Sequence, residues 1–133
     1  MKNRAAAIII QNQKLLVIHR QKPEQDYYIL PGGGVELEES FEEACIREVK
    51  EETGLDVLSL QLVRKYYTLE KEEYYFIAQV TPGEPVLGGA EAQRQSQNNH
   101  YAFEWVDTRQ LQEINLLPRA ARRICLEVAQ NYL

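Results

Sequence analysis

Three glutamates near the middle of the chain have the spacing of one helix face. Glu48, Glu51 and Glu52 lie three and four residues apart, so in a helix they point into one sector of about 100°. Like charges at this spacing destabilise an isolated helix by roughly 0.2–0.5 kcal/mol per pair. Hard divalent cations such as Mg²⁺ prefer oxygen ligands and bind through a few carboxylates. The spacing alone fits either a solvated acidic face or a carboxylate site for such a cation.

Negative charge is concentrated around these glutamates. Residues 24–52 contain ten acidic and two basic side chains, a local charge of −8, whereas the whole chain has a net charge of −5. A nucleic-acid-binding domain needs a basic face to neutralise phosphates, so the composition disfavours that class. A ligand that carries phosphates could bind this segment only with cations bridging the two sets of oxygens.

The sequence around the glutamates predicts the helix that presents them. Ser40 and Glu43 have the spacing of a capping box, and Gly54 is a typical helix stop. Just before this helix, residues 32–34 are all glycine, which allows the backbone to approach a ligand closely and to offer its carbonyl groups. The apolar residues of the helix recur at helical spacing, which predicts that Phe41, Ala44, Cys45 and Val49 form its buried stripe.

The rest of the chain predicts a mixed sheet with helices on two sides, folded as a single domain over residues 1–133. No apolar run is long enough to span a membrane, and Cys45 and Cys125 form no CxxC motif. We therefore expect a cytoplasmic protein without disulfides. The expected elements are a hairpin of residues 5–10 and 15–18, a strand at 27–30, strands within 55–80, a long loop over 81–100, a strand at 103–106, and helices at 108–114 and from 118.

One motif distinguishes between the two interpretations of the glutamates. Counted from Gly33, the chain has five residues, Glu39, seven residues, and then the sequence Arg-Glu-Val-Lys-Glu-Glu-Thr-Gly-Leu over residues 47–55. This matches every fixed position of the 23-residue pattern called the Nudix box. The protein therefore resembles the Nudix (MutT-like) hydrolases.

The resemblance implies a fold and an activity. The fold would be an α/β/α sandwich in which the box forms a loop, a helix and a loop. The activity would be hydrolysis of the diphosphate linkage in a nucleoside diphosphate derivative, with Mg²⁺ or Mn²⁺ as cofactor. By the same resemblance, Glu48, Glu51 and Glu52 would hold the metal, with the Gly32 carbonyl as a further ligand. Glu48 would also act as the catalytic base, oriented by Arg47.

Three residues outside the box are further candidates. Arg20 ends a predicted strand and could bind a substrate phosphate, or it could be an ordinary surface arginine. Many Nudix enzymes supply one more glutamate after the box, and Glu91 and Glu104 are the acids available between residues 85 and 106. Glu91 follows two glycines in a long loop, which favours it as a group carried by a mobile lid. Both could instead be plain surface acids.

The expected partner is a small nucleotide diphosphate. We expect binding neither to nucleic acid nor to a membrane, and the sequence leaves a homodimer as a possibility. The alternative function is a non-catalytic, nucleotide-sensing Nudix module. The intact set of box glutamates argues against it.

Overall fold

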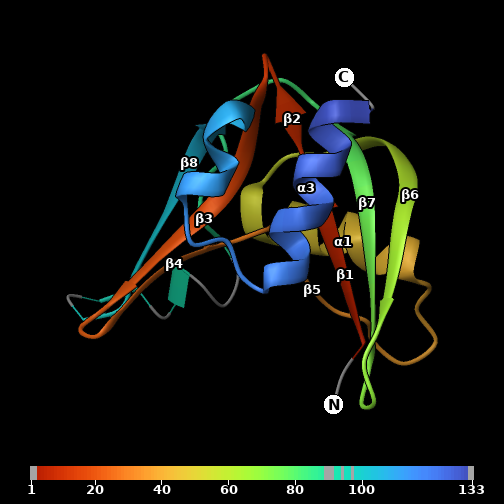
Figure 1. The fold of residues 1–133 in the computed structure, drawn as a ribbon. Coiled ribbons are helices and arrows are strands. Elements are labelled where there is room, and N and C mark those ends of the chain that lie inside the picture. The colour runs from red at the N-terminus through yellow and green to blue at the C-terminus, as the bar shows by residue number, and fades with distance from the viewer. Residues whose placement is uncertain (1–2, 89–91, 94, 97, 132–133) are drawn as a thin grey trace.

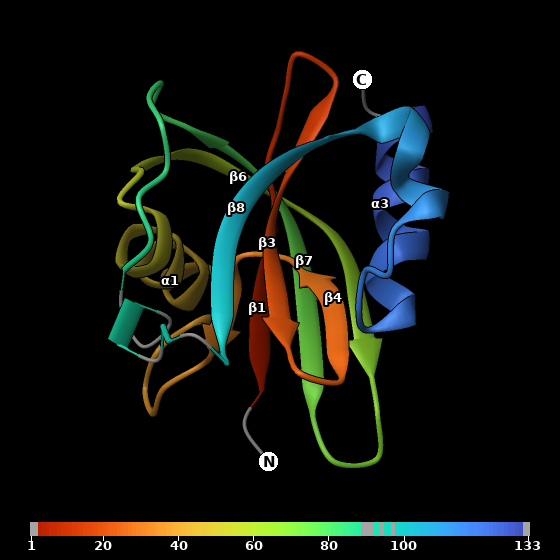
Figure 2. The same ribbon diagram turned by 90° about the vertical axis from the view of Figure 1, so that its left-hand side faces the viewer.

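The strands lie between two helices that cover opposite sides. In the computed structural model, which describes residues 3–88, 92–93, 95–96 and 98–131, the helices Phe41–Thr53 (α1) and Arg119–Asn131 (α3) lie on either side of the strands (Figure 1 and Figure 2). The expected α/β/α arrangement is therefore confirmed. The remaining elements are β1 (Arg4–Ile8), β2 (Ile10–Gln11), β3 (Lys14–Lys22), β4 (Gln25–Ile29), β5 (Gly32–Gly34), β6 (Val57–Tyr67), β7 (Glu72–Val80), β8 (His100–Asp107) and the 3₁₀ helix η1 (Thr108–Glu113).

The described strands are arranged in a mixed and an antiparallel sheet. The first sheet has the order β5-β1-β7-β6, in which β1 and β7 are parallel and the other pairs are antiparallel. The second sheet has the order β2-β3-β4, with β8 paired along the other edge of β3. The short strand β5 consists of the three glycines, so it places them at the edge of the first sheet, next to β1.

The predicted hairpin of residues 5–10 and 15–18 is only partly correct. Residues Ile10 and Gln11 pair with β3, but β1 leaves this sheet and pairs with β5 and β7 instead. The reason is burial, because Ala5–Ile9 are buried on both faces. A strand covered on both faces is typical of the centre of a layered α/β fold, and its uniform apolar sequence carries no information about which strand pairs with it.

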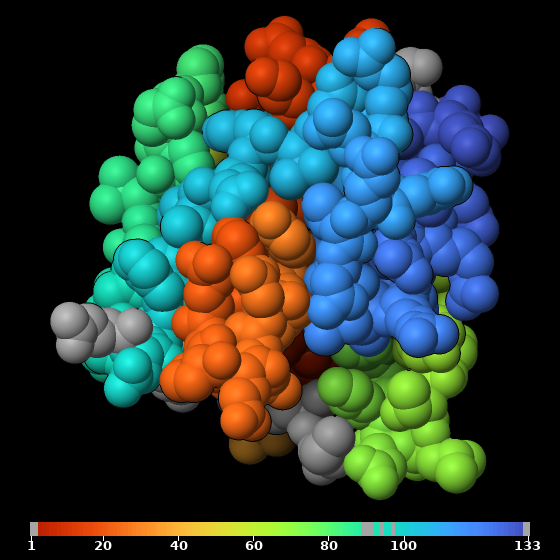
Figure 3. Space-filling model, turned by 60° about the vertical axis from the view of Figure 1, so that its left-hand side comes forward, coloured from red at the N-terminus to blue at the C-terminus, as the bar shows by residue number. Residues whose placement is uncertain are grey.

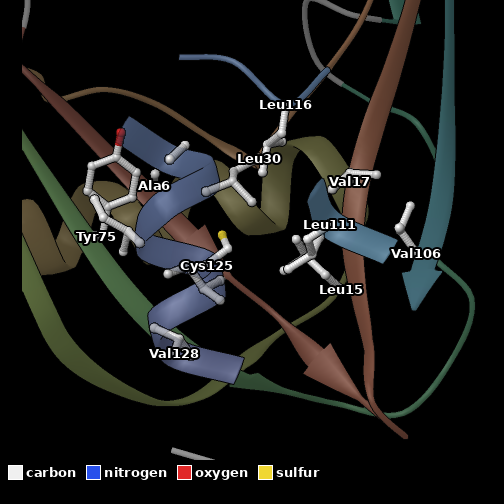
Figure 4. Close-up of a cluster of buried hydrophobic side chains, with 13 residues drawn as sticks. Ala6, Leu15, Val17, Leu30, Tyr75, Val106, Leu111, Leu116, Cys125 and Val128 are labelled. Carbon is white, nitrogen blue, oxygen red and sulfur yellow. The ribbon is translucent and has the colours of Figure 1, made fainter. Parts of the chain in front are cut away.

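Successive residues of β1 point to opposite faces of the sheet and so belong to two separate apolar cores. Ala6 and Ile8 face α3 and pack in a cluster with residues from β3, β7 and η1 (Figure 4). Ala5 and Ala7 face α1 and pack against the stripe of that helix. Within the stripe, Ala44, Cys45 and Val49 are fully buried, as predicted, and Phe41 is partly buried. Burial raises the pKa of the thiols of Cys45 and Cys125 to about 12, as expected of core cysteines.

The ends of α1 agree with the sequence prediction. The Ser40 side chain accepts a hydrogen bond from the backbone N–H of Glu43, and the Glu43 side chain accepts one from the backbone N–H of Ser40. Gly54 adopts the left-handed conformation, with φ of 76°, and its N–H donates to the carbonyl of Lys50. No helix in the described part of the chain combines the length and the apolar character that a bilayer-crossing segment needs.

One histidine links three of the four strands of the second sheet. His19 in β3 lies between two carboxylates on the neighbouring strands: its Nδ1 is 2.6 Å from Oε2 of Glu104 in β8, and its Nε2 is 2.5 Å from Oδ1 of Asp26 in β4. The imidazole also stacks on the Tyr28 ring, with a centroid distance of 4.2 Å. Burial alone lowers the pKa of His19, but the hydrogen bonds and charges of Asp26 and Glu104 outweigh it and raise the pKa above 6.5.

This pKa shift predicts a pH-dependent contribution to stability. The folded state favours protonated His19, so the contribution is fully present below the unfolded-state pKa of about 6.5 and is lost as the pH rises through the higher folded-state pKa. We expect the melting temperature of His19→Gln to fall further below that of wild type near pH 6 than near pH 9. His100→Gln, a change at an exposed histidine of β8, is measured alongside as the matched control. A His19→Gln difference that is constant with pH would contradict the prediction.

Candidate active site

The guanidinium of Arg47 organises the charged face of α1. Its Nε donates to Oε2 of Glu39 at 2.7 Å and its Nη2 donates to Oε1 of the same carboxylate at 2.9 Å, a two-point contact. Nη2 also donates to the carbonyl of Gly34 at 3.0 Å. Arg47 therefore holds the loop before α1 and the end of β5 against the helix.

The third nitrogen of the same guanidinium lies between two of the predicted metal ligands. Nη1 donates to Oε1 of Glu48 at 2.9 Å and to Oε2 of Glu51 at 3.3 Å. The hydrogen bonds to Glu39 and then to Glu48 raise the pKa of Arg47 above its ordinary value, although burial opposes the shift. Arg47 is therefore positively charged at any physiological pH and fixes the orientation of the Glu48 carboxylate.

The glycine strand lies close to two of the three glutamates, Glu52 and Glu48. Oε1 of Glu52, a residue only 4% exposed, accepts a hydrogen bond from the N–H of Gly32 at 2.7 Å. The Glu48 carboxylate lies against Gly33, where an added Cβ would be 2.4 Å from Cδ and 2.6 Å from both oxygens of Glu48. Only glycine leaves room for the carboxylate in this position.

The C-terminal end of α1 is completed by the segment after β7. The last carbonyls of a helix have no partner within it. Here the N–H of Val86 donates to the Thr53 carbonyl at 2.9 Å, and the N–H of Gly88 donates to the Glu52 carbonyl at 3.0 Å. A Cβ at Gly88 would lie 2.5 Å from the Glu51 carbonyl oxygen. This segment therefore packs directly on the backbone of Glu51 and Glu52.

The donor chemistry of this group fits a hard divalent cation. Three carboxylates on α1 and the carbonyls of the glycine strand are the oxygen ligands that Mg²⁺ and Mn²⁺ take. In the part of the chain that the structure describes, no three His, Cys, Asp or Glu side chains are arranged to hold a metal ion. The donors are near one another, but Glu48 and Glu51 contact Arg47 and Glu52 contacts Gly32 instead.

A cavity of about 630 Å³ opens next to β1, on the side of the strand that faces α3. Figure 3 shows its mouth as a hollow between β4, the start of α3 and the β6–β7 turn, with β1 at its floor. Arg4 and Ala6 of β1 line it, and these residues pair with Gly34 and Gly32 of β5. Paired strands are about 4.8 Å apart, so the cavity begins one strand away from the glycines that contact the glutamates and Arg47.

Arg20 is one of the residues that line this cavity. Its guanidinium lies between its neighbours on the two adjacent strands, 5.5 Å from the ring centre of Tyr27 and 4.4 Å from that of Tyr101. Its Nη2 donates a long hydrogen bond of 3.4 Å to Oδ1 of Asn99. The structure thus places Arg20 at the cavity, and its role in substrate binding stays a prediction.

The two candidates for an additional glutamate have different outcomes. Glu104 does not lie near the box glutamates. Its neighbours along β8, Phe103 and Trp105, pack on the α1 side. The Glu104 side chain therefore points to the opposite face of the sheet, where it contacts His19. Glu91 lies outside the described residues.

Sequence reasoning missed a buried carboxylate in the cavity wall. Glu73 in β7 is 7% exposed and lines the cavity, 3.4 Å from Nζ of Lys71 and 3.9 Å from Nε of Arg4. A charged residue within an apolar and tyrosine-rich strand was the available signal. Its meaning depended on the parallel pairing that places Arg4 next to Glu73.

Comparison with known proteins agrees with this geometry. The model of the NUDIX domain matches residues 1–126. The uncharacterized Nudix hydrolase YvcI of Bacillus subtilis is 25% identical over 111 residues, which are 84% of this chain and 69% of that protein. The ADP-ribose pyrophosphatase of Methanocaldococcus jannaschii is 36% identical over 83 residues, or 62% of this chain, and the match spans only 49% of that enzyme.

The fold matches solved structures over nearly its whole length. A MutT structure from work on Aliivibrio salmonicida and Vibrio cholerae superposes with a TM-score of 0.75 at 21% identity and covers 97% of both chains. Together with the match to the domain model, the arrangement of the box on a loop, α1 and a loop identifies the family. The chain belongs to the Nudix hydrolase family.

Proposed function

We propose that the protein hydrolyses the diphosphate linkage of a nucleoside diphosphate derivative in the presence of Mg²⁺ or Mn²⁺. The observation that carries the proposal is the packing of the box glutamates against the glycine edge, one strand away from a cavity large enough for the rest of a nucleotide. Typical small-molecule sites have volumes of about 300–1,000 Å³. The membership of the Nudix family supports the same reaction class.

Glu48 is the proposed base. Its carboxylate can accept the proton of an attacking water, provided that it is held ionised and correctly oriented. The contact with Nη1 of Arg47 supports both conditions, because a fixed positive charge favours the carboxylate form and the hydrogen bond restricts its rotation. Glu39 is the proposed positioning residue for Arg47, through its two-point contact.

Glu48, Glu51, Glu52 and the carbonyl of Gly32 are the residues proposed to hold the divalent cation. When bound, such a cation neutralises phosphate oxygens, stabilises the charge that develops on the leaving phosphate and makes water a better nucleophile. The chain supplies the rest: β5 brings its backbone close to the diphosphate, and the cavity takes the remaining part of the substrate, with Arg20 as the cation that binds a phosphate oxygen.

A panel of substrates tests the reaction class. Release of phosphate-containing products from nucleoside triphosphates, nucleotide sugars, ADP-ribose and dinucleotides should require Mg²⁺ or Mn²⁺. Tight nucleotide binding without turnover across the panel would instead support the alternative, a non-catalytic sensing module.

Removing single carboxylates tests the site. We predict that Glu48→Gln and Glu52→Gln each reduce turnover by about 10²-fold or more, since each removes a charge from the centre of the reaction. Neither change should unfold the protein, because in Glu52→Gln the amide oxygen of the new side chain can still accept the hydrogen bond from Gly32. Steady-state kinetics and circular dichroism measure the two effects. Glu42→Gln, an exposed change on the same helix, is the matched control, and wild-type rates in both site variants would refute the assignment.

Metal binding should stabilise the folded protein. The proposed ligands come together only when α1 and β5 are packed, so millimolar Mg²⁺ or Mn²⁺ should raise the melting temperature of wild type. The same titration of Glu52→Gln should give a smaller shift, and that of Glu42→Gln an unchanged one. Identical melting temperatures with and without metal in wild type would count against the proposed ligand set.

Gly33→Ala separates the position of Glu48 from its chemistry. The new methyl group would overlap the Glu48 carboxylate, which is the mobile end of a side chain and can move away. We therefore expect a folded protein that has lost most of its activity, by about tenfold or more on the usual scale for a displaced catalytic group. Thermal unfolding and kinetics of the same sample measure both quantities. Full activity would show that the close contact between Gly33 and Glu48 is not needed.

A further inference from the structure

Two side chains in contact with each other, Arg20 and Tyr101, each contain a buried polar atom that makes no hydrogen bond to the described residues. Among the buried side-chain nitrogen and oxygen atoms of the described residues, Nε of Arg20 and the hydroxyl of Tyr101 make no hydrogen bond. These two side chains are in contact, with the guanidinium carbon 4.4 Å from the Tyr101 ring centre. Tyr101 is 2% exposed. Buried polar groups in folded proteins are nearly always paired, and leaving them unpaired costs stability.

Both residues are fixed by the structure around them. Arg20 is the cross-strand neighbour of Tyr101 in the pairing of β3 with β8, and of Tyr27 in the pairing with β4. The backbone of Tyr101 is held by the Gln95 side chain, which accepts from its N–H at 2.6 Å and donates to its carbonyl at 2.9 Å. The two unpaired atoms are therefore features of an ordered part of the sheet.

The charges in the cavity direct an anion to Arg20, which lines the cavity, while Tyr101 packs on the Arg20 guanidinium from outside that lining. Three cationic side chains line the cavity. Arg4 and Lys71 both lie within 4 Å of the Glu73 carboxylate, whereas within the described residues Arg20 has no carboxylate partner. Among the described residues, the hydrogen-bond acceptor of Arg20 is the amide oxygen of Asn99, at the long distance of 3.4 Å. Arg20 is thus the end of the cavity where positive charge is not compensated.

We propose that Arg20 and Tyr101 together bind a phosphate oxygen of the substrate. In the complex the oxygen replaces Asn99 as the acceptor for the guanidinium, Nε–H donates to the ligand, and the Tyr101 hydroxyl donates a second hydrogen bond to it. The proposal rests on the proposed function, because it takes the substrate to be a nucleotide. It adds Tyr101 as a binding residue and explains why an unpaired hydroxyl is retained at a buried position.

The proposal predicts opposite effects on stability and on binding. Tyr101→Phe removes the unpaired hydroxyl and keeps the ring, so its melting temperature should equal or exceed that of wild type. Its affinity for a nucleoside 5′-monophosphate should fall about tenfold, the usual loss for one hydrogen bond to a charged group. Arg20→Gln should lose more affinity than Tyr101→Phe. Tyr67→Phe, at an exposed tyrosine of β6 outside the cavity, should change neither quantity.

The test uses calorimetric titration with the four common nucleoside 5′-monophosphates and with the matching nucleosides, alongside thermal unfolding. The losses should appear for the monophosphates, with the nucleosides unaffected, because the subsite binds the phosphate. A lower melting temperature with unchanged affinity in Tyr101→Phe would overturn the proposal, since the hydroxyl would then be paired with a water inside the fold. Equal losses for nucleoside and monophosphate, or no measurable binding of any monophosphate to wild type, would also overturn it. Turnover is not part of the readout, so a failure of the proposed hydrolysis would be seen separately, in the substrate panel.

Discussion

A single guanidinium makes the acidic face of α1 possible. In the part of the chain that the structure describes, four glutamates lie within 4 Å of Arg47, namely Glu36, Glu39, Glu48 and Glu51. In its absence their carboxylates would repel one another across the loop and the helix. The planar fork of an arginine can meet two oxygens of Glu39, a backbone carbonyl and the Glu48 carboxylate at once, whereas a lysine has one nitrogen to offer. The loop, the glycine strand and the helix therefore have their relative positions fixed by one side chain.

The packing around α1 could be predicted because its determinants are local in sequence. The capping box, the left-handed Gly54 and the face shared by the glutamates all depend on residues within one helix and its two ends. Glu39 and Arg47, which hold the loop against the helix, are only eight residues apart. The resemblance to the Nudix box added the identity of the family, which spacing alone could not provide.

The cavity could not be predicted because its determinants are pairings between distant strands. Arg20 meets Tyr101, and Arg4 meets Glu73, only through the registers of β3 with β8 and of β1 with β7. The β1 sequence is apolar on both faces, so its periodicity gave no reason to separate it from β3. The same reason applies to Glu104. The sequence showed that it alternates with Phe103 and Trp105, but the face to which it points depends on what those two rings pack against.

The parallel pairing of β1 with β7 has a consequence for folding kinetics. A strand near the N-terminus must wait for a partner close to residue 75, and β3 must wait for β8, so that His19 meets a glutamate 85 positions later. Closing such distant contacts is slow compared with forming a local helix. On the ribosome, α1 with its caps can form early, while the apolar strand β1 stays without its central partner until β7 emerges. During synthesis this strand therefore stays exposed to aggregation for longer than a strand whose partner is close in sequence.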